Sequence, residues 1–323
     1  MRAPVSPQLR PLLDRRLVVV SGKGGTGKTT LVATLALAAA DRGLRVAIVE
    51  TGRRQQIPAL FEVAGPGGDY EGIRLPEGPW AMRMEPYAAL AEYLQLQLRI
   101  PGLVTRLLDQ AAFHALLDAA PGWRELITLG KVWHLEQARD RGEPVWDLLI
   151  IDAPATGHGL TFLDVPGVVI QAVRAGPLRR HVEWVEAMVQ DAERTLLLPI
   201  TLPEELPVRE TLELVERARG EVGIAVDRIV VNGVVDEPLR PPLPDLAERL
   251  AALPPGGAPD PRALVHAFVH RRERAALHRE AIETLTHALD LPLTLLPSLE
   301  SGVLGVGPLR SLGRALFAAE ART

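Results

Sequence analysis

The sequence predicts an α/β fold: a doubly wound, mostly parallel sheet with helices on both faces and an inserted helical subdomain. Three observations lead to this prediction. Apolar stretches of strand type recur at residues 17–20, which is an unbroken run, and at 44–49 and 146–151, each with one charged residue near its start. A glycine-rich loop separates the first run from the Ala/Leu-rich stretch 30–41, which is typical of a helix. Residues 87–139 repeat apolar side chains at three- and four-residue spacing, as helices do.

The order of these elements favours one domain. The first two apolar runs are joined by a single helix, which indicates a βαβ unit with parallel strands and a right-handed crossover. With 323 residues, the chain fits one α/β domain over residues 16–323, with a helical insertion at roughly 87–140 and 160–192. Residues 1–15 contain three prolines and three arginines, and we expect them to form a loose N-terminal arm.

The composition excludes several classes of protein. Apolar residues make up 47% and charged residues 24%, which is ordinary for a globular domain, and no run of about 20 uncharged apolar residues could span a membrane. No signal peptide is recognisable, so we expect a cytoplasmic protein. The net charge of -4 predicts no broad attraction to nucleic acid. The chain has no cysteine, which excludes disulfides, thiolate metal sites such as zinc sites, and a thiol nucleophile.

Residues 22–29 read Gly-Lys-Gly-Gly-Thr-Gly-Lys-Thr and fit the phosphate-loop (P-loop) spacing G-x-x-x-x-G-K-[ST]. Glycines let the backbone curl and point several N–H groups at an anion, and the following helix adds partial positive charge. Lys28 can reach the β- and γ-phosphates, and the Thr29 hydroxyl can bind Mg²⁺. The expected nucleotide-binding residues of this loop are Gly24, Gly25, Thr26, Gly27, Lys28, Thr29 and Thr30.

The chain has three lysines, and two of them, Lys23 and Lys28, lie in this loop. A flexible ammonium group therefore has a specific role here. Lys23 is not part of an ordinary phosphate loop. With it, the loop resembles the deviant form found in dimeric nucleotide-switch ATPases: the MinD/ParA-type proteins, the nitrogenase iron protein, the arsenite-pump ATPase (ArsA) and the tail-anchored-protein targeting ATPase. The resemblance implies ATP or ADP as ligand and a Lys23 that reaches the partner subunit's nucleotide.

The segment after the second apolar run departs from this family. Residues 50–55 read Glu-Thr-Gly-Arg-Arg-Gln, at the place where the arsenite-pump family carries its first switch. Gly52 stands where the resemblance implies an aspartate that orients the attacking water. Glu50 is the nearest carboxylate. Three interpretations stay open: Glu50 substitutes as a catalytic residue, hydrolysis is slow, or the chain binds nucleotide without cleaving it. Glu50 could also simply end the strand and pair with Arg53 or Arg54.

The run at residues 146–151 ends in Asp152, a carboxylate that suits a water-mediated contact with Mg²⁺ beside the phosphate loop. Residues 152–158 read Asp-Ala-Pro-Ala-Thr-Gly-His and closely resemble the second switch of the arsenite-pump family. The resemblance implies that this segment senses the γ-phosphate and passes the signal to the following helices. His158 could equally make a structural hydrogen bond at the turn.

Further matches to the family lie in the second half of the chain. Residues 203–211 resemble a family segment close to the nucleotide and the dimer interface, although the two acidic residues at the start of this helix are also explained by simple capping through the helix dipole. The resemblance implies that Asn232 reads the adenine edge, which an amide can do because it both donates and accepts. It also implies that the loop containing Pro297 and Leu299 covers the adenine. The apolar stripe of a closing helix at residues 307–320 fits core packing better than a membrane surface, since its polar face has few cations.

Residues 121–131 resemble the helical insertion of bacterial members of this family. In the targeting ATPase the corresponding subdomain forms an apolar groove for a client's transmembrane helix, so a hydrophobic protein client is implied here. The plainer alternative is that the apolar stripes pack against each other. The absence of cysteine speaks against arsenite binding and against the zinc clasp of the targeting ATPase, which uses cysteine pairs.

The sequence thus favours a Mg²⁺-dependent ATPase that acts as a dimeric switch, either a homodimer or a heterodimer with a paralogue. Its expected catalytic residues are Lys23, Lys28, Asp152 and Glu50, and its expected metal ligands are Thr29 and Asp152. Two alternatives remain. The chain could be a nucleotide-binding scaffold that hydrolyses weakly and pairs with a paralogue, or a MinD/ParA-like positioning switch.

Overall fold

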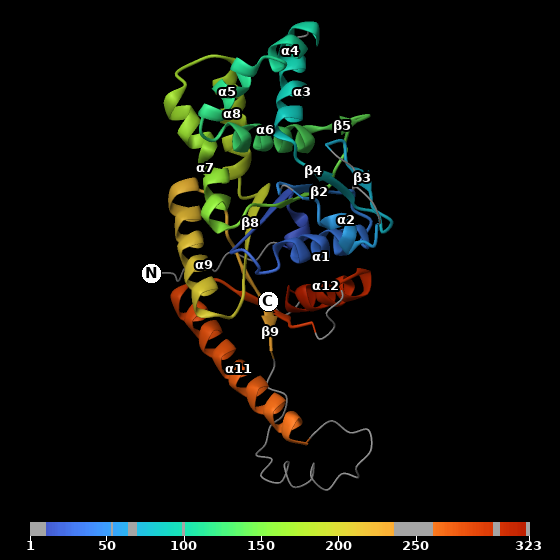
Figure 1. The fold of residues 1–323 in the computed structure, drawn as a ribbon, viewed down its shortest axis with the longest axis vertical. Coiled ribbons are helices and arrows are strands. Elements are labelled where there is room, and N and C mark those ends of the chain that lie inside the picture. Colours follow the sequence, from blue (N-terminus) through green and yellow to red (C-terminus); the bar gives the residue numbers. More distant parts are fainter. Residues whose placement is uncertain are drawn as a thin grey trace, which may run out of the picture.

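An eight-stranded sheet forms the centre of the computed structural model, which describes residues 11–52, 54–63, 70–98, 101–235, 261–299 and 304–320 (Figure 1). The strand order is β10-β9-β8-β1-β7-β2-β4-β3, and all pairs are parallel except β3 with β4. The strands are β1 (Leu17–Ser21), β2 (Val46–Glu50), β3 (Ile73–Arg74), β4 (Trp80–Arg83), β7 (Leu148–Asp152), β8 (Thr195–Thr201), β9 (Ile229–Val234) and β10 (Leu293–Pro297). The predicted doubly wound, mostly parallel sheet is confirmed.

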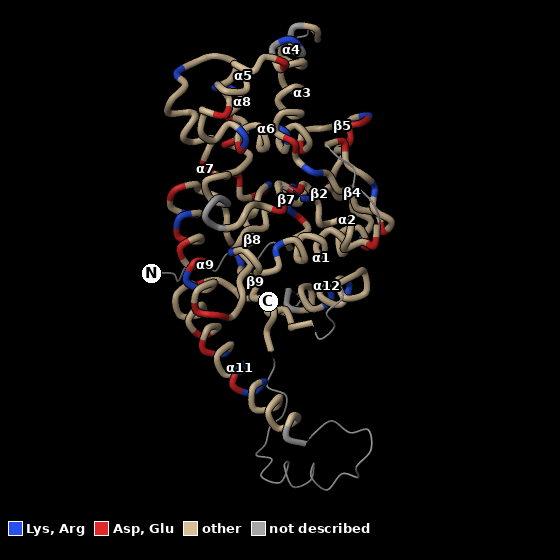
Figure 2. The backbone as a smooth tube through the Cα atoms, in the orientation of Figure 1, with Lys and Arg blue, Asp and Glu red and all other residues tan. Residues whose placement is uncertain are grey.

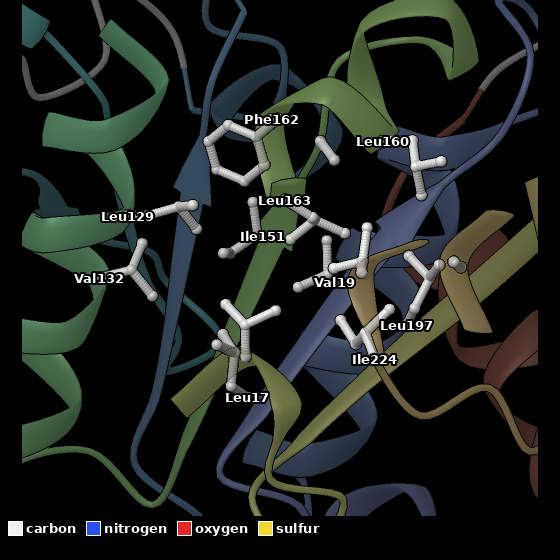
Figure 3. Packing of buried hydrophobic residues seen from close by; sticks show 14 of the residues in the cluster. Leu17, Val19, Leu129, Val132, Ile151, Leu160, Phe162, Leu163, Leu197 and Ile224 are labelled. Carbon is white, nitrogen blue, oxygen red and sulfur yellow. The ribbon is translucent and has the colours of Figure 1, made fainter. Parts of the chain in front are cut away.

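Alternate residues of each central strand enter one of two hydrophobic cores, which explains why the strands read as unbroken apolar runs. In β1, Leu17 and Val19 face one core, whereas Val18 and Val20 face the other. The first core is packed by α6 (Trp123–Gln137), α7 (Thr156–Ala172), α8 (Pro177–Gln190), α9 (Glu205–Arg217) and α11 (Pro261–Ala288). Figure 3 shows Leu129 and Val132 of α6 and Phe162 and Leu163 of α7 directed at this face of the sheet.

The opposite face is covered by α1 (Lys28–Ala40), α2 (Ile57–Leu60) and α12 (Val306–Glu320). Helix α1 has a single charged residue, Lys28 at its amino end (Figure 2). Its residues from Leu31 to Ala39 are buried. Leu309, Leu312 and Leu316 of α12 are buried against α1 and the sheet. The expected core packing of this closing helix is therefore confirmed, and its apolar face is not available to a membrane surface.

A group of helices lies beyond the sheet at the top of Figure 1, in the two segments expected to form the insertion. Besides α6, α7 and α8, it contains α3 (Pro86–Leu98), α4 (Pro101–Leu108) and α5 (Ala111–Ala119). Helices α3, α6, α7 and α8 pack on one another, and Trp133 of α6 stacks on Trp184 of α8. Trp184 is nevertheless 47% exposed. Of the helices that the structure describes, none is both long and apolar enough to cross a membrane.

Two short regions differ from the sequence-based expectation. Residues 1–15 were expected to be a loose arm, but the described part contains a 3-10 turn, Leu12–Asp14, whose Leu12 is only 1% exposed. Arg15 also forms an ion pair with Asp227 at 3.1 Å. The core therefore begins earlier than residue 16, while residues 1–10 lie outside the described residues. Strand β4 was not predicted either, because its four residues mix apolar side chains with an arginine.

Candidate active site

A cavity of about 390 Å³ lies where β1, β2 and β7 end and α1 begins. Because the carboxyl ends of parallel strands share one edge of the sheet, the loops that follow them meet there. The pairing register places Asp152 of β7 beside Val20 of β1 and Glu50 of β2. The cavity is lined by Gly25, Gly27, Lys28, Thr29, Thr30, Thr51, Gly52, Gln56, Asp152, Ala153 and Pro154.

The shape of the phosphate loop depends on three of its glycines. Gly25 and Gly27 have φ angles of 86° and 95°, in the left-handed region that disfavours side chains. A Cβ on Gly22 would lie 2.1 Å from the carbonyl oxygen of Ile200, and one on Gly27 would lie 2.4 Å from the amide nitrogen of Asn232. The loop therefore runs so close to β8 and β9 that only glycine fits at these two positions.

Lys28, the first residue of α1, lines the cavity as predicted. Its Nζ donates hydrogen bonds to the carbonyl oxygens of Gly22 at 3.1 Å and Lys23 at 3.0 Å. Burial lowers the pKa of Lys28, while the nearby charge of Asp152 acts in the opposite direction. The ammonium group is thus held against the loop backbone at the edge of the cavity, where it could interact with the phosphates of a bound nucleotide.

Thr29 and Asp152, the two expected metal ligands, are brought together. The Thr29 hydroxyl donates a hydrogen bond to Oδ2 of Asp152 at 2.7 Å. Burial raises the pKa of Asp152, opposed by this hydrogen bond and by the charge of Lys28. A hydroxyl and a carboxylate are hard oxygen donors, and Mg²⁺ is usually held by few protein oxygens together with substrate phosphates and water. The residues present therefore fit Mg²⁺ bound with a nucleotide.

Lys23 makes a contact within its own chain. Its Nζ lies 2.7 Å from Oε1 of Glu210 in α9, and the two side chains are 28% and 30% exposed. Helix α9 belongs to the segment expected near the nucleotide, so the structure places that segment beside the phosphate loop. To reach a partner subunit's nucleotide, Lys23 would have to leave Glu210.

Glu50 was a candidate catalytic residue, and in the structure it is buried and is not among the residues that line the cavity. The residue is 2% exposed, and Oε1 accepts hydrogen bonds from the backbone N–H groups of Gln56 at 2.7 Å and Ile57 at 3.1 Å. Burial raises the pKa of Glu50, against the effect of these two hydrogen bonds. Its observed partners are thus backbone N–H groups at the start of α2. Of the two arginines with which it could alternatively pair, Arg53 lies outside the described residues, and no ion pair with Arg54 is observed.

Two polar side chains in the cavity were not predicted as site residues: Thr51 and Gln56. The Thr51 hydroxyl donates to the carbonyl oxygen of Asp152 at 2.7 Å, which ties the first switch to the second. Gln56 is exposed and begins the turn into α2. Sequence reasoning could have suggested both residues, because they follow the carboxyl end of β2, and residues that follow parallel strands gather at one edge of the sheet.

The remaining predicted residues do not line this cavity. Asn232 donates from Nδ2 to the carbonyl oxygen of Thr26 at 2.9 Å and so supports the loop from β9. Thr26 is buried, and Gly24 is exposed, where an added Cβ would have no described atom within 4 Å apart from its chain neighbours. Pro297 ends β10, next to the end of β9. Leu299 packs against the core. The side chains of residues 156–158 of the second switch lie outside the described part of the structure.

Known proteins match this chain over most of its length. The sequence profile of the anion-transporting ATPase (ArsA) family matches residues 15–180. ATPase BagA of Mycobacterium tuberculosis is 32% identical over 323 residues, which cover 93% of this chain and 92% of that protein. An arsenical pump-driving ATPase of Escherichia coli is 29% identical over 204 residues, or 62% of this chain and 32% of that protein. ATPase ASNA1 homolog 1 of Paramecium tetraurelia is 24% identical over 279 residues, or 73% of this chain and 80% of that protein.

Proposed function

Because this chain belongs to the anion-transporting ATPase (ArsA) family, and is thus a phosphate-loop ATPase, we propose that it works as a Mg²⁺-dependent dimeric switch in the cytoplasm. In this proposal it binds and hydrolyses ATP, and the cycle controls access to a hydrophobic protein client. The observation that best supports it is the meeting of Lys28, Thr29 and Asp152 around one cavity beside left-handed glycines.

The phosphate loop and the helix after it supply the groups that would bind the nucleotide. The loop's backbone N–H groups and the amino end of α1 attract the phosphates, and Lys28 exchanges its two carbonyl partners for phosphate oxygens. Thr29 and Asp152 would hold Mg²⁺, which when bound neutralises charge that develops on the β- and γ-phosphates. Burial lowers the pKa of Lys28, and the negative charge of a bound phosphate would act in the opposite direction, as that of Asp152 does.

Hydrolysis by such a site depends on position and charge more than on covalent chemistry. Lys28 stabilises negative charge on the transferred phosphoryl group, because it is fixed at the cavity and partly removed from water. Asp152 keeps the Thr29 hydroxyl oriented. Lys23 of the partner subunit would add a second cation once dimer closure separates it from Glu210.

The proposed route to the client runs through α7. This helix begins at Thr156, four residues after Asp152, and packs on α6 and α8 in the helical group. A loop that orders around the γ-phosphate would therefore pull on the first turn of α7 and shift the helices beyond it. Apolar side chains already exposed on that group include Leu96, Val168, Leu178 and Trp184, which suits contact with a hydrophobic client.

A second candidate function rests on Gly52. In place of a carboxylate the cavity has a residue with no side chain, which favours slow hydrolysis. The chain would then be a nucleotide-bound scaffold that pairs with an active paralogue, and the dimer would be a heterodimer. Nucleotide binding is common to both candidates, so only turnover separates them.

Single-turnover hydrolysis of radiolabelled ATP by the purified protein, at high protein concentration with Mg²⁺, decides between the two. We expect phosphate release. Tight ATP binding without release would support the scaffold instead. Mass measurement with ADP and with a non-hydrolysable ATP analogue tests the switch: we expect a dimer with the analogue, and a monomer in both states would contradict the dimeric mechanism.

A further inference from the structure

We propose that Gln56 is the catalytic residue that orients the attacking water, in the role that a carboxylate at position 52 would otherwise have. The proposal rests on the ATP hydrolysis proposed above. It starts from the side of the cavity formed by the first switch, whose described lining residues are Thr51, Gly52 and Gln56.

Of these three residues, only Gln56 offers a side chain that can turn toward a water molecule. Gly52 has none. The Thr51 hydroxyl already donates its hydrogen to the carbonyl oxygen of Asp152 at 2.7 Å, which fixes its direction. Gln56 is exposed at the cavity, and no hydrogen bond of its side-chain amide is observed in the described part of the chain. The amide is therefore the polar group on this side that can still accept and donate.

Glu50 is excluded as the group that touches this water. Its side chain is 2% exposed and does not line the cavity. Oε1 accepts from the N–H groups of Gln56 and Ile57, and Oε2, which has no hydrogen-bond partner among the described residues, is itself buried. The same two hydrogen bonds give Glu50 another task. They hold the backbone of Gln56 at the start of α2 and so determine where its side chain leaves the chain. Glu50 is thus a positioning residue that acts through Gln56.

An amide suits this reaction. Its carbonyl oxygen can accept a hydrogen bond from the water while its NH₂ group donates to a γ-phosphate oxygen, which aligns the water with the phosphorus. Glutamine orients the attacking water in the same way in several phosphate-loop GTPases. The water oxygen forms a bond to the γ-phosphorus, and the bond from that phosphorus to the bridging oxygen breaks with its electron pair leaving on ADP. The protons of the water pass to the released phosphate and to solvent, so Gln56 need not take up a proton.

The test compares Gln56→Ala with Gln55→Ala, a matched control that removes the neighbouring glutamine, which is not among the lining residues. We expect Gln56→Ala to lower kcat about 30- to 100-fold while KM for ATP changes less than about threefold, because only the transition state loses a contact. The Gln55→Ala variant should stay within about twofold of the wild type. Equal turnover of Gln56→Ala and wild type would overturn the assignment.

A binding measurement supplies a readout that does not depend on turnover. Fluorescent ADP with Mg²⁺ should bind Gln56→Ala and the wild type alike. Adding aluminium fluoride, which mimics the phosphoryl group in transfer together with its water, should slow ADP release strongly in the wild type and in Gln55→Ala but not in Gln56→Ala. Equal slowing in all three proteins would contradict a role of Gln56 in the transition state.

Variants of Glu50 show whether the Gln56 amide or the Glu50 carboxylate orients the water. Glu50→Gln keeps a carbonyl oxygen for the two backbone N–H groups, so it should retain turnover within about threefold if Glu50 only positions Gln56. Adding Glu50→Ala to Gln56→Ala should slow the reaction little further, since both act through one group. If Glu50→Gln were as slow as Gln56→Ala while binding ADP normally, the carboxylate would be the reactive group and our assignment would be wrong.

The failure of this assignment is distinguishable from failure of the proposed function. A wild-type protein that binds ATP and releases no phosphate removes the reaction, and with it both proposals. Wild-type turnover that survives in a folded Gln56→Ala variant removes only the role of Gln56 and leaves the ATPase in place.

Discussion

The two sides of the candidate active site are built differently. The phosphate side, residues 22–29 with Asp152, consists of a strand end, a helix start and a tight loop. Side-chain hydrogen bonds from Lys28 and Asn232 to the loop backbone, and from Thr29 to Asp152, hold it in place. The first-switch side, residues 50–57, has a glycine at its centre and its carboxylate turned into the interior. We infer that capture of the nucleotide and its cleavage depend on separate structures, and that the second has changed while the first follows the family pattern.

This difference has a physical reason. The phosphate side is enclosed by β8 and β9, where even a methyl group on Gly22 or Gly27 would collide with its neighbours. The first switch is a loop. Among the described residues, a Cβ on Gly52 would meet the Arg54 carbonyl oxygen alone, at an ordinary contact distance of 3.7 Å. Loops accept changes of chemistry that a packed strand–helix junction does not. Substitutions on the two sides should therefore have effects of different size and kind.

The largest effect is expected at Lys28. Lys28→Ala should lower single-turnover hydrolysis about 100-fold or more and weaken ATP binding, because the cavity loses its buried cation. Lys28→Arg should also be strongly impaired, since a planar guanidinium cannot replace a point charge inside the loop. The matched control is Lys131→Arg in α6, whose lysine pairs with Glu92; it should leave hydrolysis unchanged. Wild-type ATP binding by Lys28→Ala would contradict the importance of the phosphate side.

The second effect concerns Mg²⁺. Thr29→Ala should raise the Mg²⁺ concentration needed for half-maximal hydrolysis about tenfold, because the site loses an oxygen ligand and Asp152 loses its hydrogen bond. Titration of Mg²⁺ at saturating ATP measures this. Thr29→Ser keeps the hydroxyl and should behave like the wild type. An unchanged Mg²⁺ requirement in Thr29→Ala would show that the metal is held elsewhere.

A smaller effect, and one in the opposite direction, is expected at the first switch. Gly52→Asp should raise kcat about three- to tenfold, because a second group can then orient the water and the backbone there tolerates a side chain. The Gly52→Ala variant, which adds a side chain without a carboxylate, is the control and should give no gain. Equal rates for the two variants would mean that the missing carboxylate does not limit the reaction.

The smallest expected effect is the contribution of Glu50 to the pH dependence of the free energy of unfolding. Burial raises the pKa of Glu50 above its ordinary value of 4.5, so between these two values the folded protein binds more protons than the unfolded chain. The free energy of unfolding of the wild type, relative to Glu50→Gln, should therefore fall as the pH rises through this window and then level off. Urea denaturation of both proteins over a pH series measures it, and a difference that is constant or grows with pH would contradict the buried position.

Much of this architecture was predictable because its signals are local. The buried strands read as unbroken apolar runs since both faces of the sheet are covered by helices. The phosphate loop could be recognised because its glycines are required by backbone geometry. The apolar stripe of α12 correctly indicated core packing. By contrast, β4 was missed because a four-residue strand has no periodicity to detect, and its place depends on pairing with β2.

The candidate site likewise contains residues that a local motif predicts and residues whose placement depends on tertiary contacts. The sequence alone pointed to Lys28, Thr29 and Asp152 as neighbours, because each belongs to a motif at a strand end or a helix start, and all three line the cavity. It could not assign Glu50, since a carboxylate after a strand can face a cavity or the interior with the same neighbours in sequence. Only the path of the chain into α2 directs Glu50 at the N–H groups of Gln56 and Ile57.

What the sequence determined by itself is the fold class and the phosphate-binding chemistry, because both depend on residue type at short spacing. The tertiary structure decided which side chains share the cavity. It tied Lys23 to Glu210, set Asn232 against the loop, buried Leu12 and left Gln56 facing the cavity. The contacts of Lys23, Asn232 and Leu12 involve residues far apart in the chain, so no local sequence pattern reveals them. The direction of the Gln56 side chain depends instead on how the chain turns into α2.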